Sequence, residues 1–478
     1  NLYDSYIRAI RWATNRIGER GVVAFVTNGS FLDANNMDGL RKCLIEDFSH
    51  LYVFNLRGNA RTQGEERRKE GGGIFDAGSR TPVAVTIMVK DPAHAGPGEL
   101  HYHDIGDYLS QQEKLDIIEG FGSIDAMPWV KLAPNDEGDW ANQRDPRFEG
   151  FVPLGAREDE QEPAVFGFSS LGVHTARDAW TYNYSHAGLA SNMRCMIDAY
   201  NEEVERYKRA CDGKPKDQWP KVEGFVDTDP KRISWSSSLL PNVVRGRVAD
   251  FKHASIVVSM YRPYSKQRLY FQKMLNDRMG RMLQVFPTPD HQNKVIAATG
   301  IGASKTFSAL VAHCLPNYHM HDTGQCFPLY WYEKADADAT PQGEMFSAAS
   351  APDAGGYVRR DAITDWALDA FRGHYGDAAI SKEDIFWYVY GILHSPEYKQ
   401  RFAADLKKML PRVPFAEDFR AFSAAGRQLG EWHLNYETVE PFPLTEEAKR
   451  LVMEPDDYLV TKMTFGKKDG KPDKSVIV

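Results

Sequence analysis

The sequence predicts an α/β domain followed by an α+β region whose C-terminal part is helical. Three apolar runs near the N-terminus carry the first half of this prediction: Val22–Thr27, Leu51–Leu56 and Val83–Val89. Their length and β-branched content are typical of strands, and the first run suits a strand buried on both faces, as in a parallel sheet. Apolar residues at helical spacing over Leu2–Ile17 and Asn36–Phe48 predict two helices that accompany these strands.

The remaining elements follow the same patterns. A short strand is expected at Glu99–Asp104, a helix near Tyr108–Glu119, and a loop in the acidic, proline-rich stretch Ala133–Glu162. Further on, Ala187–Arg209 predicts a long helix, and residues 254–261 and 266–271 predict two strands. We therefore expect a first domain over residues 1–92, a connecting region over 93–165, and a larger domain over 166–478.

The last of these three regions has internal boundaries. Residues 335–357 are low in complexity and predict a flexible loop. Residues 358–450 are expected to be mainly helical. Ser381 and Asp384 form an acidic variant of the capping box before one apolar run, and Ser395-Pro396 places a proline in the first turn of the next helix.

The amino-acid composition argues against several classes of protein. The chain has 478 residues, of which 42% are hydrophobic and 26% charged, as in ordinary globular proteins. No apolar run approaches the roughly 20 residues of a membrane span. The five cysteines are scattered without a C-x-x-C pair, so neither a zinc site nor a disulfide framework is expected. Reduced cysteines of this kind are typical of a cytoplasmic protein.

The charge is unevenly distributed. The formal net charge is −8, yet residues 231–281 contain eleven Lys and Arg against two Asp, a local charge of +9 that leaves −17 elsewhere. A cationic segment of this kind attracts phosphate, and aromatic residues, including Trp235 and Tyr261, are interleaved with it. The alternative is a solvated face neutralised by acidic segments. The candidate phosphate-binding residues here are Lys231, Arg232, Arg245, Arg247, Arg262, Lys266 and Arg268.

A second candidate surface lies between the second and third strands. This connection is charged and glycine-rich, and Phe75 is its only aromatic residue. A large ring in a loop either packs down as a local anchor or is presented to a ligand. Four arginines of the same segment are candidates for phosphate contacts, with weak surface ion pairs as the alternative: Arg57, Arg61, Arg67 and Arg80.

These segments resemble a known family. The order of a helix, a strand ending in Thr27-Asn28, a strand entering an Arg-rich loop, and Gly-Ile-Phe before a last strand resembles the back half of the catalytic domain of adenine-N6 DNA methyltransferases. More narrowly, GVVAFVTNGSFLD, YVFNLRGNARTQGE and GGIFDAGSRTPVAV are similar to Type ISP restriction-modification enzymes. So are VHTARDAWTYNYS, SMYRPYSKQRLYF, DTGQCFPLYWYE and the helical segment from Asp384 to Phe415.

The resemblance implies an incomplete Rossmann-like methyltransferase sheet followed by a DNA target-recognition domain. It implies double-stranded DNA and the remaining domains of a parent polypeptide as partners, and S-adenosylmethionine as the methyl donor. ATP and Mg²⁺ would serve other parent domains. Phe75 stands where the family has an aromatic residue that stacks on an extruded adenine.

Two motifs of such methyltransferases are missing. Neither the cofactor glycine loop nor an N-P-P-Y-type motif precedes the strands. We therefore interpret the chain as a fragment that lacks the first half of its catalytic sheet, has no cofactor-binding residues of its own, and is inactive alone. The alternative is a non-catalytic DNA-binding specificity module on a methyltransferase-like scaffold; a more distant one is an interaction protein that binds no nucleic acid.

Overall fold

The computed structural model describes residues 4–75, 78–155, 163–335, 352–441, 443, 452–458, 464–468 and 470–477. The chain divides into two compact units, Asn1–Leu434 and Asn435–Val478. The larger unit is a mixed α/β structure with several small sheets. Almost all of the elements expected from the sequence lie within it.

A five-stranded sheet forms the N-terminal part of the larger unit, in the order β1-β3-β2-β4-β5. Its strands are β1 (Gly21–Asn28), β2 (His50–Arg57), β3 (Val83–Lys90), β4 (Glu99–Asp104) and β5 (Val130–Leu132). The strands expected from the sequence are confirmed. The expected parallel sheet is wrong, because β2 and β4 pair in parallel whereas the other pairs are antiparallel.

The expectation that the first strand is buried on both faces is also wrong. Among the described strands, β1 has a neighbour on one side only, which is β3. Val23 is buried, but Val22 is 61% exposed and Val26 is 55% exposed. Alternate residues of a strand point to opposite faces, so one face of β1 is covered and the other is bare.

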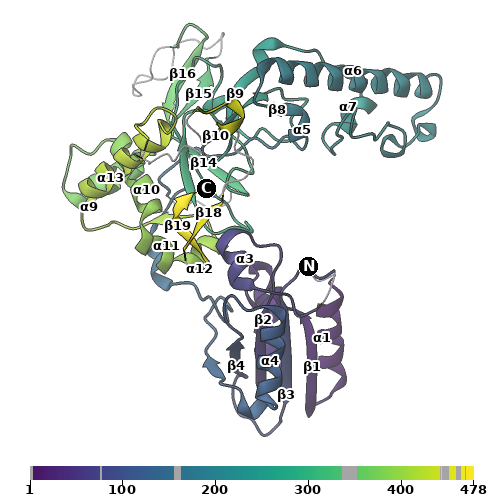
Figure 1. Ribbon diagram of the computed structural model, residues 1–478, viewed down its shortest axis with the longest axis vertical. Coiled ribbons are helices and arrows are strands. Elements are labelled where there is room, and N and C mark those ends of the chain that lie inside the picture. The colour runs from purple at the N-terminus through teal and green to yellow at the C-terminus, as the bar shows by residue number, and fades with distance from the viewer. Residues whose placement is uncertain are drawn as a thin grey trace. The chain divides into compact units, whose positions relative to one another are not determined.

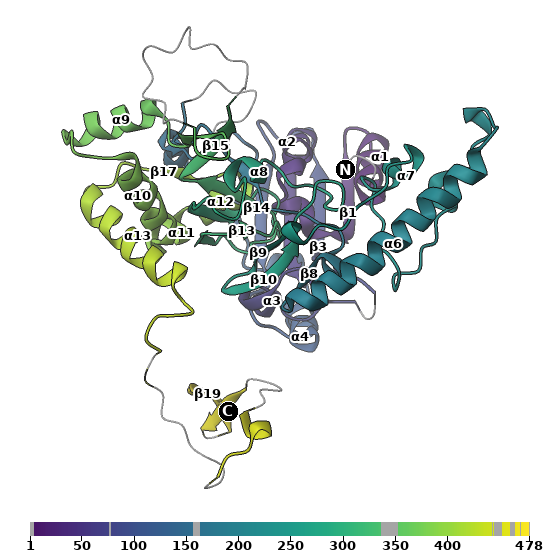
Figure 2. The same ribbon diagram turned by 90° about the horizontal axis from the view of Figure 1, so that it is seen from above.

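Helices cover the two faces of this sheet differently. α1 (Ser5–Arg16) and α2 (Asp38–Asp47) pack on one face and lie next to each other (Figure 2). Their core there includes Ile10, Leu44 and Leu51. α4 (Gln111–Phe121) contributes Ile117 and Phe121 to a separate core on the other face. This arrangement follows from the alternation of β2, which sends Leu51 and Phe54 to opposite faces.

A short helix interrupts the charged connection that the sequence suggested was a loop. α3 spans Gly64–Glu70. Its first turn holds Glu65 and Glu66, and its last turn holds Arg67, Arg68 and Lys69. Acidic residues at the N-terminus and basic residues at the C-terminus of a helix complement its dipole, which explains why this polar segment is helical.

The rest of the larger unit contains small sheets and a helical part (Figure 1). Two four-stranded sheets have the orders β13-β9-β10-β8 and β12-β11-β14-β7, and β15–β16 and β17–β6 form two-stranded sheets. The strands are β6 (Val152–Pro153), β7 (Ser170–Leu171), β8 (Tyr182–Asn183), β9 (Ile256–Arg262), β10 (Ser265–Tyr270), β11 (Val295–Thr299), β12 (Ala309–Ala312), β13 (Leu315–Pro316), β14 (Gly324–Pro328), β15 (Tyr330–Lys334), β16 (Tyr357–Asp361) and β17 (Arg412–Val413).

The helices of this part confirm several expectations. They are α5 (Asp178–Thr181), α6 (His186–Cys211), α7 (Leu240–Val244), α8 (Met282–Val285), α9 (Asp365–Tyr375), α10 (Lys382–His394), α11 (Pro396–Arg401), α12 (Ala403–Lys408) and α13 (Phe419–Leu434). The long helix is α6, and the two expected strands are β9 and β10. Ser381 and Asp384 form the capping box of α10, and Ser395 caps α11 with proline in its first turn. Most of the expected flexible loop, residues 336–351, lies outside the described residues.

A buried charge network ties α12 to the N-terminal part. Asp139 lies 2.8 Å from the Lys408 ammonium, 2.8 Å from Arg144 Nε and 3.4 Å from Arg41 Nη2. Asp139, Arg41 and Lys408 are all almost fully buried. Lys408 also lies 3.5 Å from Asp33. Burying a charge is costly unless it is paired or hydrogen-bonded, so these ion pairs favour one packing of the two parts.

Asp405 lies beside this network without a matching cation. It is 1% exposed, its Oδ2 accepts a bond from the Asp145 backbone nitrogen at 3.2 Å, and its Oδ1 has no partner among the described residues. Burial raises the pKa of Asp405 to about 6. Because the folded-state pKa exceeds the ordinary value, this group stabilises the fold at low pH, and that stabilisation is lost as the pH rises through about 6.

We therefore expect Asp405→Asn to increase the free energy of unfolding at pH 8 by about 1–3 kcal/mol, since the amide carries no charge to desolvate. Below pH 4 the variant and the wild type should be equally stable. Denaturant titrations at both pH values measure the difference. Asp217→Asn, which changes an exposed carboxylate, is the control and should shift stability by less than about 0.5 kcal/mol. A destabilised Asp405→Asn at pH 8 would contradict the assignment.

The smaller unit, taken by itself, contains a hairpin of β18 (Phe465–Lys468) and β19 (Lys471–Ile477). Throughout the part of the chain that the structure describes, no helix is both long and apolar enough to cross a membrane.

Candidate nucleic-acid interface

The β9–β10 hairpin is the centre of the first candidate surface. Arg268 of β10 pairs with Val258 of β9 and with Asn183 of β8, and its side chain is exposed. Tyr184 follows β8, is 73% exposed, and its hydroxyl lies 3.3 Å from Ser265 Oγ. An exposed cation held on a hydrogen-bonded sheet is suited to a phosphate contact, and an exposed ring at the edge of the same sheet is suited to stacking on a base.

Arg262 ends β9 and is held in place from several sides. Its guanidinium carbon lies 3.9 Å from the centroid of the Tyr261 ring. Nη1 donates to the Tyr261 carbonyl at 2.7 Å and to Asn317 Oδ1 at 3.2 Å, and Nη2 lies 3.9 Å from Asp178. The side chain is 39% exposed. Stacking and hydrogen bonding orient a guanidinium for directional contacts, whereas an unsupported arginine samples many rotamers.

Histidines lie close to Arg262 in this surface. The His174 ring packs 5.2 Å from His319 and 5.6 Å from Tyr318, and its Nδ1 lies 3.4 Å from Asp277. Burial lowers the pKa of His319, so this imidazole is neutral near pH 7 and can both donate and accept. The sequence pattern did not single out these histidines. The alternation of aromatic and polar residues around Asp178 was the only sequence signal near them.

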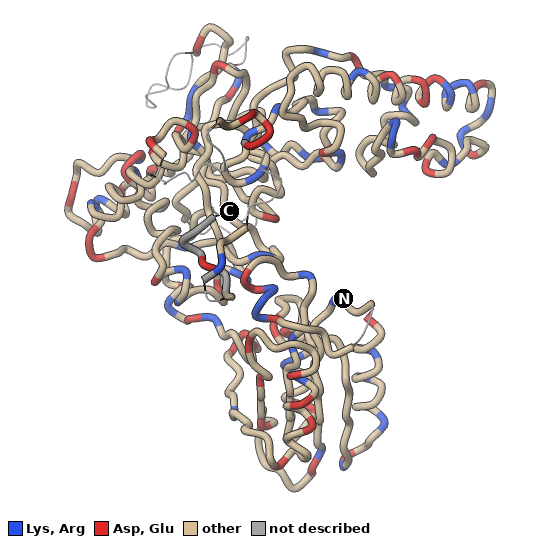
Figure 3. Tube along the Cα trace, in the orientation of Figure 1, with Lys and Arg blue, Asp and Glu red and all other residues tan. Residues whose placement is uncertain are grey.

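The other predicted cations of this segment differ in their contacts and exposure. Arg232 is bonded to Glu202 and Asp227, and Arg247 Nη1 lies 3.4 Å from Asn242 Oδ1. Lys231 and Arg245, like Arg268, are exposed and make no side-chain hydrogen bond or ion pair to a described residue. Lys266 is half-buried on β10. Along the neighbouring α6, acidic and basic residues are interleaved (Figure 3).

The four predicted arginines of the Phe75 segment also differ in their contacts and exposure. Arg57 has a left-handed φ of 55°, and its guanidinium is bonded to Asp104, at 2.7 Å, and to Asp107. Arg67 Nη1 donates to the Gly71 carbonyl at 2.5 Å. Arg61 and Arg80 are exposed, without a side-chain bond to a described residue. Arg57 and Arg67 therefore shape the segment, whereas Arg61 and Arg80 are available to a ligand.

Phe75 itself is 57% exposed. The half-buried Ile74 before it packs with Phe54 and Leu56, so the segment is anchored directly before the ring. No interaction between the described residues joins Phe75 to the hairpin cations. The structure thus assembles two separate surfaces, one around Phe75 and one around the β9–β10 hairpin.

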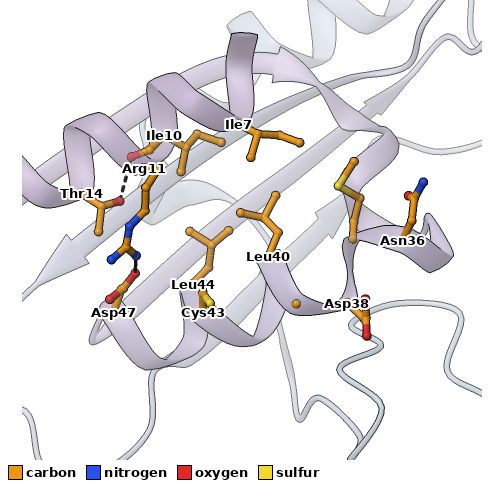
Figure 4. A pocket seen from close by; sticks show the side chains of 12 residues that line it. Ile7, Ile10, Arg11, Thr14, Asn36, Asp38, Leu40, Cys43, Leu44 and Asp47 are labelled. Atoms are coloured by element: carbon orange, nitrogen blue, oxygen red, sulfur yellow. Dashed lines mark hydrogen bonds and ion pairs between the residues drawn. The ribbon is translucent and has the colours of Figure 1, made fainter. Parts of the chain in front are cut away.

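Two hollows lie elsewhere on the larger unit. One, of about 620 Å³, is lined by Asn59 and Thr62 after β2, by residues 299–307, and by Lys399 and Lys407 of the C-terminal helices. The other, of about 680 Å³, lies between α1 and α2 and is mainly apolar (Figure 4). At one end of it, Arg11 pairs with Asp47 at 2.6 Å. The first hollow has a mixed lining, in which Asp33, Glu66 and Glu70 accompany the lysines.

Neither a metal nor the expected methyl donor has an evident site. No group of three or more potential metal-ligating side chains occurs among the described residues. In the sequence, no strand of the five-stranded sheet leads through a G-x-G-x-x-G turn into a helix, the geometry that commonly binds a nucleotide cofactor. The described residues therefore lack a turn that would hold the nucleoside part of S-adenosylmethionine in this geometry.

Comparison with known proteins identifies what this arrangement is similar to. The family model of the Type ISP C-terminal specificity domain matches residues 164–478. The comparison with curated protein sequences found no match. Among solved structures, a nuclease-deletion mutant of the Type ISP restriction-modification enzyme LlaGI, in complex with a DNA substrate mimic, matches with a TM-score of 0.77 and 38% identity. This match covers 98% of this chain and 34% of LlaGI.

Two further structures match with similar scores. The DrdV–DNA complex has a TM-score of 0.73 and 33% identity over 95% of this chain and 42% of DrdV. The ATP-dependent Type ISP restriction-modification enzyme LlaBIII, bound to DNA, has a TM-score of 0.74 and 31% identity over 93% of this chain and 27% of LlaBIII. The chain thus spans between about a quarter and about two fifths of the length of these proteins.

Proposed function

Because this chain belongs to the Type ISP C-terminal specificity domain family, we propose that it recognises a target sequence in double-stranded DNA and contributes part of the catalytic domain of an adenine-N6 DNA methyltransferase. The enzyme would be a restriction-modification enzyme with further domains outside this chain. S-adenosylmethionine would be the methyl donor, ATP and Mg²⁺ would serve the other domains, and the enzyme would act in the cytoplasm.

The observation that carries this proposal is the β9–β10 hairpin surface, which lies inside the matched residues 164–478. Exposed Arg268, which has no partner among the described side chains, suits a phosphate contact, which gives affinity but no sequence information. The stacked and hydrogen-bonded Arg262 suits a base edge, where an oriented guanidinium makes paired hydrogen bonds to guanine. Affinity and specificity would thus come from different arginines of one hairpin.

The methyltransferase part of the proposal rests on Phe75. An adenine amino group inside a duplex is accessible to an enzyme only after the base is extruded, and extruded bases stack on aromatic rings. Phe75 is exposed, follows an anchored residue, and has the exposed cations Arg61 and Arg80 near it in sequence. Since the described residues offer no fitting cofactor site, the isolated chain is expected to bind DNA without transferring methyl groups.

The alternative is a specificity module whose methyltransferase-like part is only a scaffold. Methyl transfer to adenine by the full-length enzyme, measured with a labelled methyl donor, separates the two, since the scaffold alternative predicts none.

Salt dependence tests the DNA-binding surface. Replacing Lys231, Arg245 and Arg268 together by glutamine should weaken duplex binding. The slope of log affinity against log salt should fall by about 0.9 for each phosphate that is no longer neutralised, because fewer counterions are released. Fluorescence anisotropy with a labelled duplex at several salt concentrations measures both quantities.

The matched control removes the same charge elsewhere. Arg16, Arg20 and Lys42 are exposed cations of the N-terminal part, and replacing them by glutamine should leave the slope unchanged. An unchanged slope in the hairpin variant would place these residues outside the interface. Loss of binding in both variants to the same extent would show that only the overall charge matters.

A further inference from the structure

We propose that Gln111 and Lys114 of α4 are positioning residues that fix the backbone before Phe75, so that the ring is already oriented when the target base arrives. This inference rests on the proposed function, because it assigns these residues a purpose only if Phe75 contacts the base. Neither residue belongs to the candidate surfaces described above. Both act on Phe75 through the backbone of residues 69–74.

Lys114 is a buried cation bonded to backbone instead of a carboxylate. Its side chain is fully buried, and Nζ donates to the carbonyls of Leu56, Glu70 and Gly72, each at 2.8 Å. An ammonium group has three hydrogens to donate, so the three carbonyls satisfy it completely. No ion pair joins Lys114 to a carboxylate among the described residues. One side chain thereby connects the end of β2, the end of α3 and the glycine run before Phe75.

Burying this charge is unfavourable, which makes its presence informative. Desolvation lowers the pKa of Lys114 to about 8. An apolar side chain of similar length would fill the same volume without that cost. What it could not do is hold three separate carbonyls in one geometry. The contacts of Lys114 are therefore better explained by the placement of the segment than by stability alone.

Gln111 and the backbone complete the attachment. Gln111 Nε2 donates to the Ile74 carbonyl at 2.9 Å, which is the last bond before Phe75. The Gly72 nitrogen donates to the Leu109 carbonyl at 2.9 Å, and the Tyr108 nitrogen donates to the Lys69 carbonyl at 3.0 Å. The segment before Phe75 is thus bonded to the start of α4 and to the turn that precedes it.

The glycines permit this close approach. A Cβ atom on Gly71 would lie 2.0 Å from the Leu109 carbonyl oxygen, and one on Gly72 would lie 2.5 Å from the Gln111 nitrogen. Only residues without a side chain fit against the backbone at these distances. The glycine run therefore serves as a docking surface for α4, and Phe75 emerges from a segment that is held on one side and exposed on the other.

The consequence for function is a distinct kinetic signature. An oriented ring contributes to catalysis only once the base has been extruded, whereas the phosphate contacts of the hairpin are made earlier. Loosening the segment should therefore lower kcat and leave the KM for DNA nearly unchanged. Misplacement of a contacting group by about 1 Å reduces rates by up to about a hundredfold, so we expect a loss of about ten- to a hundredfold.

The experiment uses the full-length enzyme proposed to contain this chain. Gln111→Met removes the donor to Ile74 at a partly exposed site and is the primary variant; Lys114→Met is the second. Gln112→Met is the matched control, because Gln112 lies one residue away on the same helix and its side chain bonds Asp116, at 2.8 Å, instead of the Phe75 segment. The measurements are methylation kcat and KM, 2-aminopurine fluorescence at the target adenine, and the melting temperature.

Gln111→Met should reduce kcat about ten- to a hundredfold and weaken the 2-aminopurine signal. Its KM should change less than about twofold, and its melting temperature should stay close to that of Gln112→Met, which should behave as the wild type. In a Phe75→Ala background, Gln111→Met should cause no further loss, because a residue that acts through Phe75 has nothing left to position. A general structural role would instead add its loss to that of Phe75→Ala.

The outcomes are distinguishable. If Phe75→Ala lowers methylation and Gln111→Met does not, or if the two losses multiply in the double variant, this inference is overturned and the proposed function stands. If the wild type gives no 2-aminopurine signal or Phe75→Ala is silent, the role of Phe75 fails and the inference fails with it. Should Lys114→Met not fold, Gln111→Met alone decides the result.

Discussion

Replacing Phe75 by alanine is expected to reduce methylation by the full-length enzyme about ten- to a hundredfold, because base stacking on an aromatic side chain contributes roughly 1–3 kcal/mol. Phe75→Trp should retain more activity than Phe75→Ala, since stacking requires an aromatic face and not one particular ring. A 2-aminopurine at the target position should lose part of its fluorescence increase in the alanine variant. Single-turnover methylation on the same duplex gives the rate.

Stability is the internal control for this prediction. Phe75 is 57% exposed, so its removal should change the melting temperature little. A ring that anchors the segment would behave differently: the alanine variant would melt at a clearly lower temperature, while 2-aminopurine fluorescence would remain as in the wild type. That combination would remove Phe75 from the DNA interface and leave it a structural role.

The second large effect is expected at the buried network. Asp139→Asn should lower the free energy of unfolding by about 3–5 kcal/mol, because it leaves the buried Arg41 without its anion and removes the nearer of the two carboxylates beside the buried Lys408. The solvent-accessible pair Glu99–Lys131, at 2.7 Å, provides the comparison, and Glu99→Gln should lower the free energy of unfolding far less. Urea titrations of the three proteins measure the values. Equal effects of the two substitutions would show that the network contributes no more than a surface pair.

The pH dependence of this effect has a definite sign. Burial alone would raise the pKa of Asp139, but hydrogen bonds from Lys408 and Arg144 outweigh it and lower the pKa to about 2. The folded-state pKa is below the ordinary value of 3.8, so the stabilisation is present above about pH 4 and is lost as the pH falls toward 2. The difference between wild type and Asp139→Asn should therefore shrink in that range.

Local patterns were sufficient for most elements. The strands β1, β2 and β3, the long helix α6 and the capping box of Ser381 and Asp384 all follow from periodicity and from side-chain to backbone bonds between residues near in sequence. The charged helix α3 was missed, because its polar residues carry no apolar periodicity and only their order along the dipole favours a helix.

The sequence did not predict in the same way which strands pair with each other. The run Val22–Thr27 looks like a strand buried on both faces, yet β1 lies at an edge of the described sheet and pairs antiparallel. An apolar run reports strand propensity, whereas the number of its neighbours depends on contacts with residues far away in sequence.

In the candidate site, too, the sequence predicted some features and only the tertiary structure decided others. Charge and aromatic composition, together with the resemblance to the family, selected the segment 231–281 and Phe75, because a cationic segment and an isolated ring are visible in the sequence. The sequence does not show which arginines can contact DNA, because that depends on ion pairs with residues far away in sequence. Arg232 pairs with Glu202 and Arg57 pairs with Asp104, whereas Arg268 pairs with none of the described carboxylates. Lys114 gave no sequence signal at all, since its three acceptors are backbone carbonyls, which every residue carries and only the folded chain brings together.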